Sequence, residues 1–193
     1  MTSIRSLAVF CGSRVGIKPV YAAAGRTLGQ GLAHAGIRLV YGGGRIGIMG
    51  VVADAVLAAG GEVLGVIPDF LTKMEVAHEQ ATEMVVTDTM HTRKLRLYEE
   101  SDAFLIMPGG LGTFDETFEI ITWRQLRLHD KPILICNVAG WAEPLVTMIE
   151  HAIGQGFADP ACRQLFEVVD SVDAALNRLK TLQAGGRGEP ELL

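Results

Sequence analysis

The stretch LIMPGGLGTFDETFEI, residues 105–120, combines an apolar run, closely spaced glycines and several carboxylates. Gly110 and Gly112 let the backbone approach a ligand without a side-chain clash, and Thr113 is placed to cap a following helix. The N–H groups that have no partner at a helix start favour an anion such as phosphate. The stretch therefore predicts a phosphate-binding loop with carboxylates beside it.

Glu116 has two interpretations. The segment from Thr113 to Glu116 fits the capping-box pattern, in which the glutamate bonds back to the N–H of the cap residue. Capping needs only one acid, however, and carboxylates at a phosphate-binding helix start repel the ligand. The surplus of acids in Asp115, Glu116 and Glu119 favours chemistry, but spacing alone leaves both interpretations open.

Two other glycine-rich loops follow predicted strands, at residues 11–14 and 41–50. The second loop matches the dinucleotide pattern G-x-G-x-x-G through Gly42, Gly44 and Gly47. It follows the second predicted strand rather than the first, and the acid further along the chain, Glu62, begins a strand instead of ending one. NAD or FAD binding is therefore disfavoured, and tight turns without a ligand are the simpler alternative.

Short apolar runs alternate with helical patterns along the chain. Strands are predicted over residues 6–11, 37–43, 62–68, 83–88, 103–108 and, as the last, 132–137. Helices are predicted over about 19–36, 47–60 and 89–100, and from near Thr113 and Trp141. Continuously apolar strands need helices on both faces of the sheet. We therefore expect an α/β fold, a Rossmann-like doubly wound parallel sheet flanked by helices, with a single domain over residues 1–183 and a flexible tail over 184–193.

Composition limits the functional classes. The chain has 193 residues, 49% of them hydrophobic, and a net charge of −5, so one domain with a real core is expected and nucleic acid is not an expected partner. The odd number and the spacing of the cysteines predict reduced, mostly buried thiols at Cys11, Cys136 and Cys162. No apolar run has the length of a signal-peptide core or a membrane span, which predicts a soluble, cytoplasmic protein.

Three segments carry a family resemblance. PGGLGTFDE, residues 108–116, resembles the PGGxGTxxE motif of the LOG family, the cytokinin riboside 5′-monophosphate phosphoribohydrolases. MHTRK, residues 90–94, resembles the family's MHxRK signature, and residues 121–132 resemble its helix-to-strand segment. The glycine-rich loop at 42–50 fits as well, so the resemblance covers nearly the whole chain up to the tail.

The resemblance implies hydrolysis of the N-glycosidic bond of a nucleoside 5′-monophosphate, AMP or an N6-modified AMP, to free base and ribose 5-phosphate. It implies Arg93 and Glu116 as the catalytic pair and a homodimer with active sites near the subunit interface. With the other two glycine-rich loops, the expected substrate contacts are Glu75, Lys94, Gly110, Leu111, Gly112, Thr113, Phe114, Asp115, Thr122, Gly12, Ser13, Gly43 and Gly44. Leu111 and Asp115 stand where the family often has tyrosine and glutamate, which leaves the base preference open.

The chemistry of the groups agrees with this reading. Glycosidic cleavage develops positive charge on the sugar, which the Glu116 carboxylate can stabilise while it orients or deprotonates the attacking water. Arg93 can hold the sugar phosphate or steady the departing base, and both roles stay open. Asp115, Glu119 and Thr122 fall on one helical stripe that should border the pocket.

Alternatives exist for several of these residues. Arg93 and Lys94 outside a motif would be a solvated helix face. His91 has no second His or Cys at helical ligand spacing, so no metal and no cofactor are expected. A non-catalytic nucleotide carrier would not need both Arg93 and Glu116. A pyridoxal-phosphate decarboxylase would need a Schiff-base lysine; only Lys94 lies in an expected site, where its neighbours suit phosphate.

The expected behaviour of three probes follows. Adenosine should be a far poorer substrate than AMP if the loops bind the phosphate. Glu116→Gln should fold normally but lose activity. Arg93→Ala should abolish turnover with the fold intact, because an arginine at a crevice-facing helix start is expected to contribute little to a core.

Overall fold

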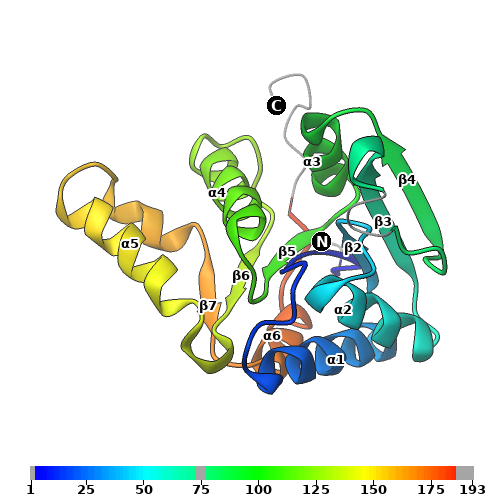
Figure 1. Cartoon of the computed structure of the whole chain (residues 1–193). Coiled ribbons are helices and arrows are strands. Elements are labelled where there is room, and N and C mark those ends of the chain that lie inside the picture. Colours follow the sequence, from blue (N-terminus) through cyan, green and yellow to red (C-terminus); the bar gives the residue numbers. More distant parts are fainter. Residues whose placement is uncertain (1–2, 73–76, 186–193) are drawn as a thin grey trace.

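The computed structural model describes residues 3–72 and 77–185. Its centre is a seven-stranded sheet in the order β4-β3-β2-β1-β5-β6-β7, and all six neighbouring pairs are parallel (Figure 1). The strands are β1 Ser6–Phe10, β2 Arg38–Tyr41, β3 Val63–Pro68, β4 Glu83–Thr87, β5 Ala103–Ile106, β6 Ile133–Cys136 and β7 Glu167–Val169. Because β1 lies in the middle and the chain winds outward in both directions from it, the predicted doubly wound sheet is confirmed.

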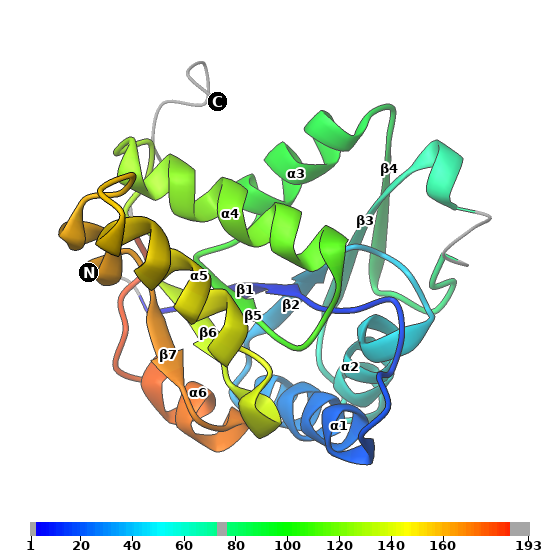
Figure 2. The ribbon, with the colours of Figure 1, turned by 60° about the vertical axis from the view of Figure 1, so that its left-hand side comes forward.

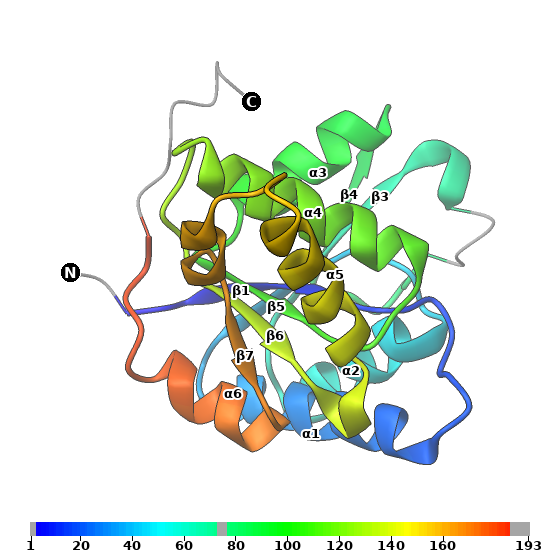
Figure 3. The ribbon, with the colours of Figure 1, turned by 90° about the vertical axis from the view of Figure 1, so that its left-hand side faces the viewer.

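Helices cover both faces of this sheet. One layer holds α1 (Pro19–His34), α2 (Gly47–Ala58) and α6 (Val172–Leu179), and the other holds α3 (Met90–Glu99), α4 (Leu111–Gln125) and α5 (Glu143–Gly154), as Figures 2 and 3 show. Short 3-10 helices follow β3, β6 and α5, at Asp69–Leu71, Val138–Gly140 and Pro160–Gln164.

Each helical layer has its own hydrophobic core. Along β1, Leu7 and Val9 pack into the core under α1, α2 and α6, whereas Ala8 and Phe10 pack into the core under α3, α4 and α5. Successive strand residues point to opposite faces, so a strand covered on both sides must be apolar throughout. This explains why the central strands read as continuous apolar runs instead of alternating ones.

The structure corrects two expected boundaries. The strand at Ile133–Cys136 is not the last, because β7 and α6 follow it. β7 has only three residues and exposes the first two, so its local pattern was weak. Helix α4 begins at Leu111 and not near Thr113; Gly110 is its N-cap, and Thr113 is buried in the first turn. The tail expected from residue 184 lies outside the described residues from 186 onward.

The three cysteines are unpaired and buried, as predicted. Burial raises the pKa of the Cys136 thiol to about 12, with the charge of Asp170 acting in the same direction. Within the described ranges, no helix is long and apolar enough to span a membrane.

Candidate active site

The glycine-rich loops meet at the carboxyl edge of the sheet, between β1 and β5. Gly12 N–H donates to the carbonyl of Pro108 at 3.0 Å, and the Gly12 carbonyl accepts from the N–H groups of Ile48 and Met49. The chain leaves β1 and β5 in opposite directions along the sheet. This is the topological switch point at which doubly wound proteins bind their ligands.

The glycines of these loops divide into two kinds. A Cβ on Gly47 would overlap the backbone of Ser13, and one on Gly109 would overlap the Thr113 side chain, so these two glycines allow the loops to pack together. Gly110 and Gly112 differ, because, apart from the adjoining residues and the backbone of the same helix, no atom of the described residues lies within 4 Å of a Cβ built on either. Close packing between the loops therefore accounts for the first kind, and open space distinguishes the second.

A cavity of about 750 Å³ opens beside these loops. Four expected substrate contacts line it, Gly12, Ser13, Gly110 and Leu111. Sequence reasoning missed further lining residues, among them Arg14, Ile17, Lys18, Tyr21 and Trp141. Trp141 could have been noticed because it closely follows a predicted strand, at the edge where ligands bind. Its indole N–H donates to the Gly109 carbonyl at 3.2 Å, and its ring stacks on Phe114 at 5.7 Å.

Arg93 lies in the first turn of α3. That helix has the capping box that was expected on α4: the Thr89 hydroxyl accepts from Thr92 N–H, and the Thr92 hydroxyl accepts from Thr89 N–H, both at 3.1 Å. The Arg93 side chain turns inward and is only 6% exposed. Its Nε donates to the Val66 carbonyl at 3.2 Å, and its Nη2 donates to the Gly42 carbonyl at 3.3 Å. The guanidinium is therefore held under the glycine loop by backbone groups.

The premise behind the expected Arg93→Ala result is wrong. An arginine with a solvated, crevice-facing side chain would contribute little to the core, but Arg93 is buried and pairs two carbonyl groups, those of Val66 and Gly42. Removing the side chain would leave these acceptors without their donor, and a buried polar group without a partner destabilises the fold.

Glu116 lies one turn into α4, and its side chain is 12% exposed. Its Oε1 lies 3.9 Å from Nη2 of Arg93, so the structure brings the predicted catalytic pair together. The capping-box interpretation is wrong, because the N-cap is Gly110 and not Thr113. Burial, together with the negative charge of Glu116, raises the pKa of the neighbouring Cys11 thiol. A raised pKa favours the neutral thiol, which is a poorer nucleophile than the thiolate.

Lys94, the next residue on α3, lies among acids. Its Nζ is 2.8 Å from Asp115 Oδ2 and 3.4 Å from Glu119 Oε2. Burial lowers the pKa of the ammonium, but the two carboxylates more than offset this effect and the net shift is upward. Burial raises the pKa of Glu119 despite the opposing charge of Lys94. The expectation that the neighbours of Lys94 suit phosphate is therefore corrected, because its direct partners are carboxylates.

The remaining expected contacts that the structure describes are not among the residues that line the cavity beside the glycine loops. Gly43 and Gly44 are buried in the second glycine loop, where the Gly43 carbonyl accepts from His78 N–H at 3.0 Å. Thr122 is exposed on α4, beyond Asp115 and Glu119. Glu75 lies outside the described residues.

The fold and the site define an α/β protein with glycine-rich loops at the carboxyl edge of its sheet and a buried Arg–Glu pair. Residues 49–179 match the family described as "Possible lysine decarboxylase". The chain is 41% identical over 178 residues to the cytokinin riboside 5′-monophosphate phosphoribohydrolase of Rhodococcoides fascians. The aligned region covers 92% of this chain and 90% of that protein. It is 42% identical over 161 residues to LOG2 of Arabidopsis thaliana, named as the same activity, with 83% and 76% covered. The chain belongs to this family, the LOG family.

Solved structures share the fold at low sequence identity. The molybdenum cofactor binding protein of Rippkaea orientalis superposes with a TM-score of 0.69 at 18% identity, covering 94% of this chain and 97% of that chain. The molybdenum cofactor carrier protein of Chlamydomonas reinhardtii superposes with a TM-score of 0.69 at 19% identity, with 94% and 98% covered. These likenesses concern the architecture alone.

Proposed function

We propose that this protein hydrolyses the N-glycosidic bond of a nucleoside 5′-monophosphate, AMP or an N6-modified AMP, to the free base and ribose 5-phosphate. The relatives are named for this activity on cytokinin riboside 5′-monophosphates. The observation that carries the proposal is the buried pair of Arg93 and Glu116 beside glycines that face open space. A carrier protein of the same fold would have no need for that pair.

The 5′-phosphate binds at the start of α4. The first N–H groups of that helix have no intrahelical partner, and the N-cap Gly110 offers no side chain to occupy them. Arg14 and Lys18 add positive charge to the cavity beside this loop. Because the phosphate is remote from the bond that breaks, its binding energy can orient the ribose for cleavage.

Glu116 acts on the sugar. As the bond to the base breaks, positive charge develops on the ribose, and a carboxylate fixed in a poorly hydrated site stabilises that charge. The same carboxylate orients the attacking water and accepts its proton. Arg93 fixes the place of the carboxylate, since its own guanidinium is held by the carbonyls of Val66 and Gly42. The proton that Glu116 takes from water is passed on to the departing base, which regenerates the carboxylate, and the sugar keeps the new hydroxyl.

The remaining expectations belong to the same proposal. The enzyme is a cytoplasmic homodimer whose active sites lie near the subunit interface, as the family resemblance implies. Glu75, Lys94 and Thr122 contact the substrate together with the glycine loops. No metal takes part in the proposed reaction, since water activation is assigned to Glu116.

Incubation with a panel of nucleoside monophosphates tests this function. Chromatography should show free base and an equal amount of ribose 5-phosphate, with AMP or an N6-substituted AMP as the best substrate. Adenosine, matched in base and sugar but lacking the phosphate, should be far poorer. Equal turnover of adenosine and AMP would overturn the phosphate assignment, and no base release from any member would overturn the activity.

Amino-acid decarboxylation, the activity in the family's description, fits Lys94 and Lys131 poorly. A lysine that forms a Schiff base with pyridoxal phosphate must reach the neutral amine. Lys94 is held as an ammonium by Asp115 and Glu119. Lys131 is buried, donates to the Tyr98 carbonyl and lies over the Tyr98 ring at 3.7 Å. An absorbance titration with pyridoxal phosphate should show no Schiff-base band.

A further inference from the structure

His78 is a buried residue that no part of the proposed mechanism uses. It is 1% exposed and is held at three points. Its backbone N–H donates to the Gly43 carbonyl at 3.0 Å, its Nδ1 accepts from Gln80 N–H at 3.3 Å, and its Nε2 lies 3.0 Å from Oδ1 of Asp54. Because Nδ1 accepts a backbone N–H, the ring hydrogen is on Nε2 and is donated to the Asp54 carboxylate.

This anchored residue lies against the second glycine loop. The Gly43 carbonyl accepts from His78, and Gly44 forms an antiparallel bridge with Ala77. On the other side of the same loop, the Gly42 carbonyl accepts from the Arg93 guanidinium. Gly43 has a φ of +79°, a left-handed conformation that glycine adopts readily and L side chains rarely adopt, so the shape of the loop depends on this glycine.

We propose that Asp54 and His78 are positioning residues for Arg93, acting through the Gly42–Gly44 loop. The Asp54 carboxylate orients the His78 ring, and the ring fixes the His78 backbone. That backbone holds the Gly43 carbonyl, and the adjacent carbonyl of Gly42 accepts from the Arg93 guanidinium. This inference rests on the proposed function, since Arg93 matters for rate only if it holds Glu116 in place.

A second buried histidine shows what the same motif does without a carboxylate. His129 Nδ1 accepts from Lys131 N–H at 3.1 Å, two residues on, as His78 accepts from Gln80. The partner of its Nε2 is the Ile120 carbonyl, at 2.9 Å. Burial lowers the pKa of His129 to about 4, so this ring is neutral and structural. His129 is therefore a matched control for a buried histidine that does not touch the loop.

The Asp54 side chain is 56% exposed on α2, so its loss should cost little stability. Asp54→Ala should lower kcat for AMP roughly five- to tenfold, because a small displacement of a catalytic group is costly in rate, with KM changed less than about twofold. Asp54→Asn should restore most of the rate, since the amide oxygen still accepts from Nε2–H. Equal rates for Asp54→Ala and the wild type would overturn the inference.

A double-mutant cycle separates positioning from general damage. In an Arg93→Lys background, Asp54→Ala should cause little further loss of kcat, because both changes act on the same group. Independent, multiplicative losses would contradict the inference. The control His129→Asn should lower Tm while leaving kcat within about twofold of wild type, as a change outside the site does. Gel filtration should give the same elution for Asp54→Ala and the wild type.

Hydrogen exchange gives a readout that does not depend on the activity. Asp54→Ala should speed amide exchange in peptides covering residues 42–50 and leave the exchange of residues 103–106 in β5 unchanged. If base release fails for the wild type while this exchange difference appears, the proposed function is wrong and the loop support stands. If activity is present and exchange is unaltered, the support by Asp54 and His78 is refuted.

Discussion

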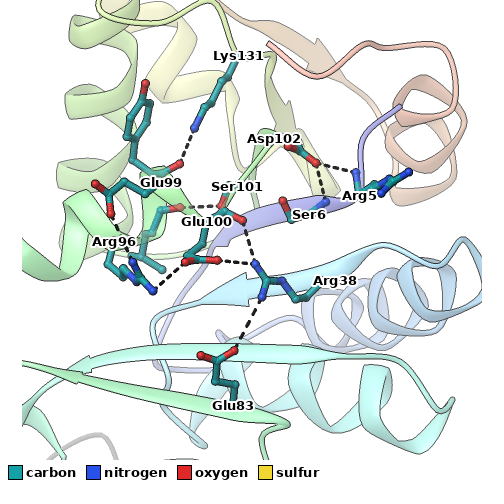
Figure 4. A network of polar contacts seen from close by, with 12 residues as sticks. Arg5, Ser6, Arg38, Glu83, Arg96, Glu99, Glu100, Ser101, Asp102 and Lys131 are labelled. Atoms are coloured by element: carbon teal, nitrogen blue, oxygen red, sulfur yellow. Dashed lines mark hydrogen bonds and ion pairs between the residues drawn. The ribbon is translucent and has the colours of Figure 1, made fainter. Parts of the chain in front are cut away.

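The two edges of the sheet use the same residue types for different purposes. At the amino edge, Arg38 Nη2 lies 2.6 Å from Glu100 Oε2, and Arg96 Nη2 lies 3.0 Å from Glu100 Oε1 (Figure 4). At the carboxyl edge, Arg93 Nη2 and Glu116 Oε1 are 3.9 Å apart, and the guanidinium donates to backbone carbonyls instead. Arg93 and Arg96 lie on one helix, so the edge that each residue reaches decides its role.

The ion pairs at the two edges differ in how deeply they are buried. The side chains of Arg38 and Glu100 are 29% and 23% exposed, whereas those of Arg93 and Glu116 are 6% and 12% exposed. Solvent-accessible ion pairs typically contribute about 0 to 1 kcal/mol, and a buried pair can cost more in desolvation than it returns. The amino-edge network is therefore a modest structural tie, and the carboxyl-edge pair is explained by chemistry better than by stability.

Glu116→Gln should have the largest effect on this comparison. It preserves the size of the side chain and removes its charge, so base release from AMP should fall on the order of a hundredfold or more. Tm should barely move. Glu100→Gln, the same change at the amino edge, should leave kcat unaltered. Near-normal release of base by Glu116→Gln would return the catalytic question to Asp115 and Glu119.

Substitution of Arg93 by alanine should lower both the rate of base release and the stability of the fold. Arg93→Ala should abolish turnover and, by leaving the Val66 and Gly42 carbonyls without their donor, destabilise the fold by about 1 to 3 kcal/mol. Arg93→Lys, which keeps the charge but not the planar fork, should fold and lose at least about tenfold in kcat. Denaturant unfolding and AMP kinetics measure both effects. Arg96→Ala is the matched control, and an equal loss of rate there would contradict the distinction between the edges.

Substitution of two glycines of the site by alanine should change different kinetic constants. A Cβ on Gly42 would overlap Nη2 of Arg93, so Gly42→Ala should displace the guanidinium and lower kcat, roughly tenfold. A Cβ on Gly110 meets none of the described atoms, so Gly110→Ala should leave Tm unchanged and raise KM for AMP by crowding the phosphate. Loss of Tm in Gly110→Ala with unaltered KM would show that this glycine serves the fold alone.

Glu119→Gln should have the smallest effect of these substitutions, and the effect should appear in the pH dependence of stability. Burial raises the pKa of Glu119 above its ordinary value of 4.5. At pH values between the ordinary pKa of the unfolded state and the raised pKa of the folded state, the folded state binds more protons than the unfolded state. Stability therefore falls as the pH rises through this window. The Tm of wild type relative to Glu119→Gln should therefore be higher at pH 4 than at pH 7, by on the order of one degree. A relative Tm that rises with pH would show that the ion pair with Lys94 dominates.

Local sequence patterns were enough to predict the layers of the fold and the sheet edge at which the glycine-rich loops meet. Apolar runs covered on both faces indicate a parallel sheet, and parallel strands bring the loops after Phe10, Tyr41 and Ile106 to one edge. The family resemblance also selected Arg93 and Glu116, which the structure brings together. β7 was missed because three residues with two exposed carry almost no periodic signal.

The partners of those side chains, in contrast, depend on packing between elements that are far apart in the sequence. Arg93 is buried because carbonyls 27 and 51 residues away receive its guanidinium, and Lys94 meets Asp115 and Glu119 because α3 and α4 lie on the same face of the sheet. Thr113 fits a cap by local spacing, but the chain enters α4 at Gly110. Local periodicity reports which side of an element is apolar; it holds no information about which distant backbone groups will satisfy a charge, since packing between elements sets those partners.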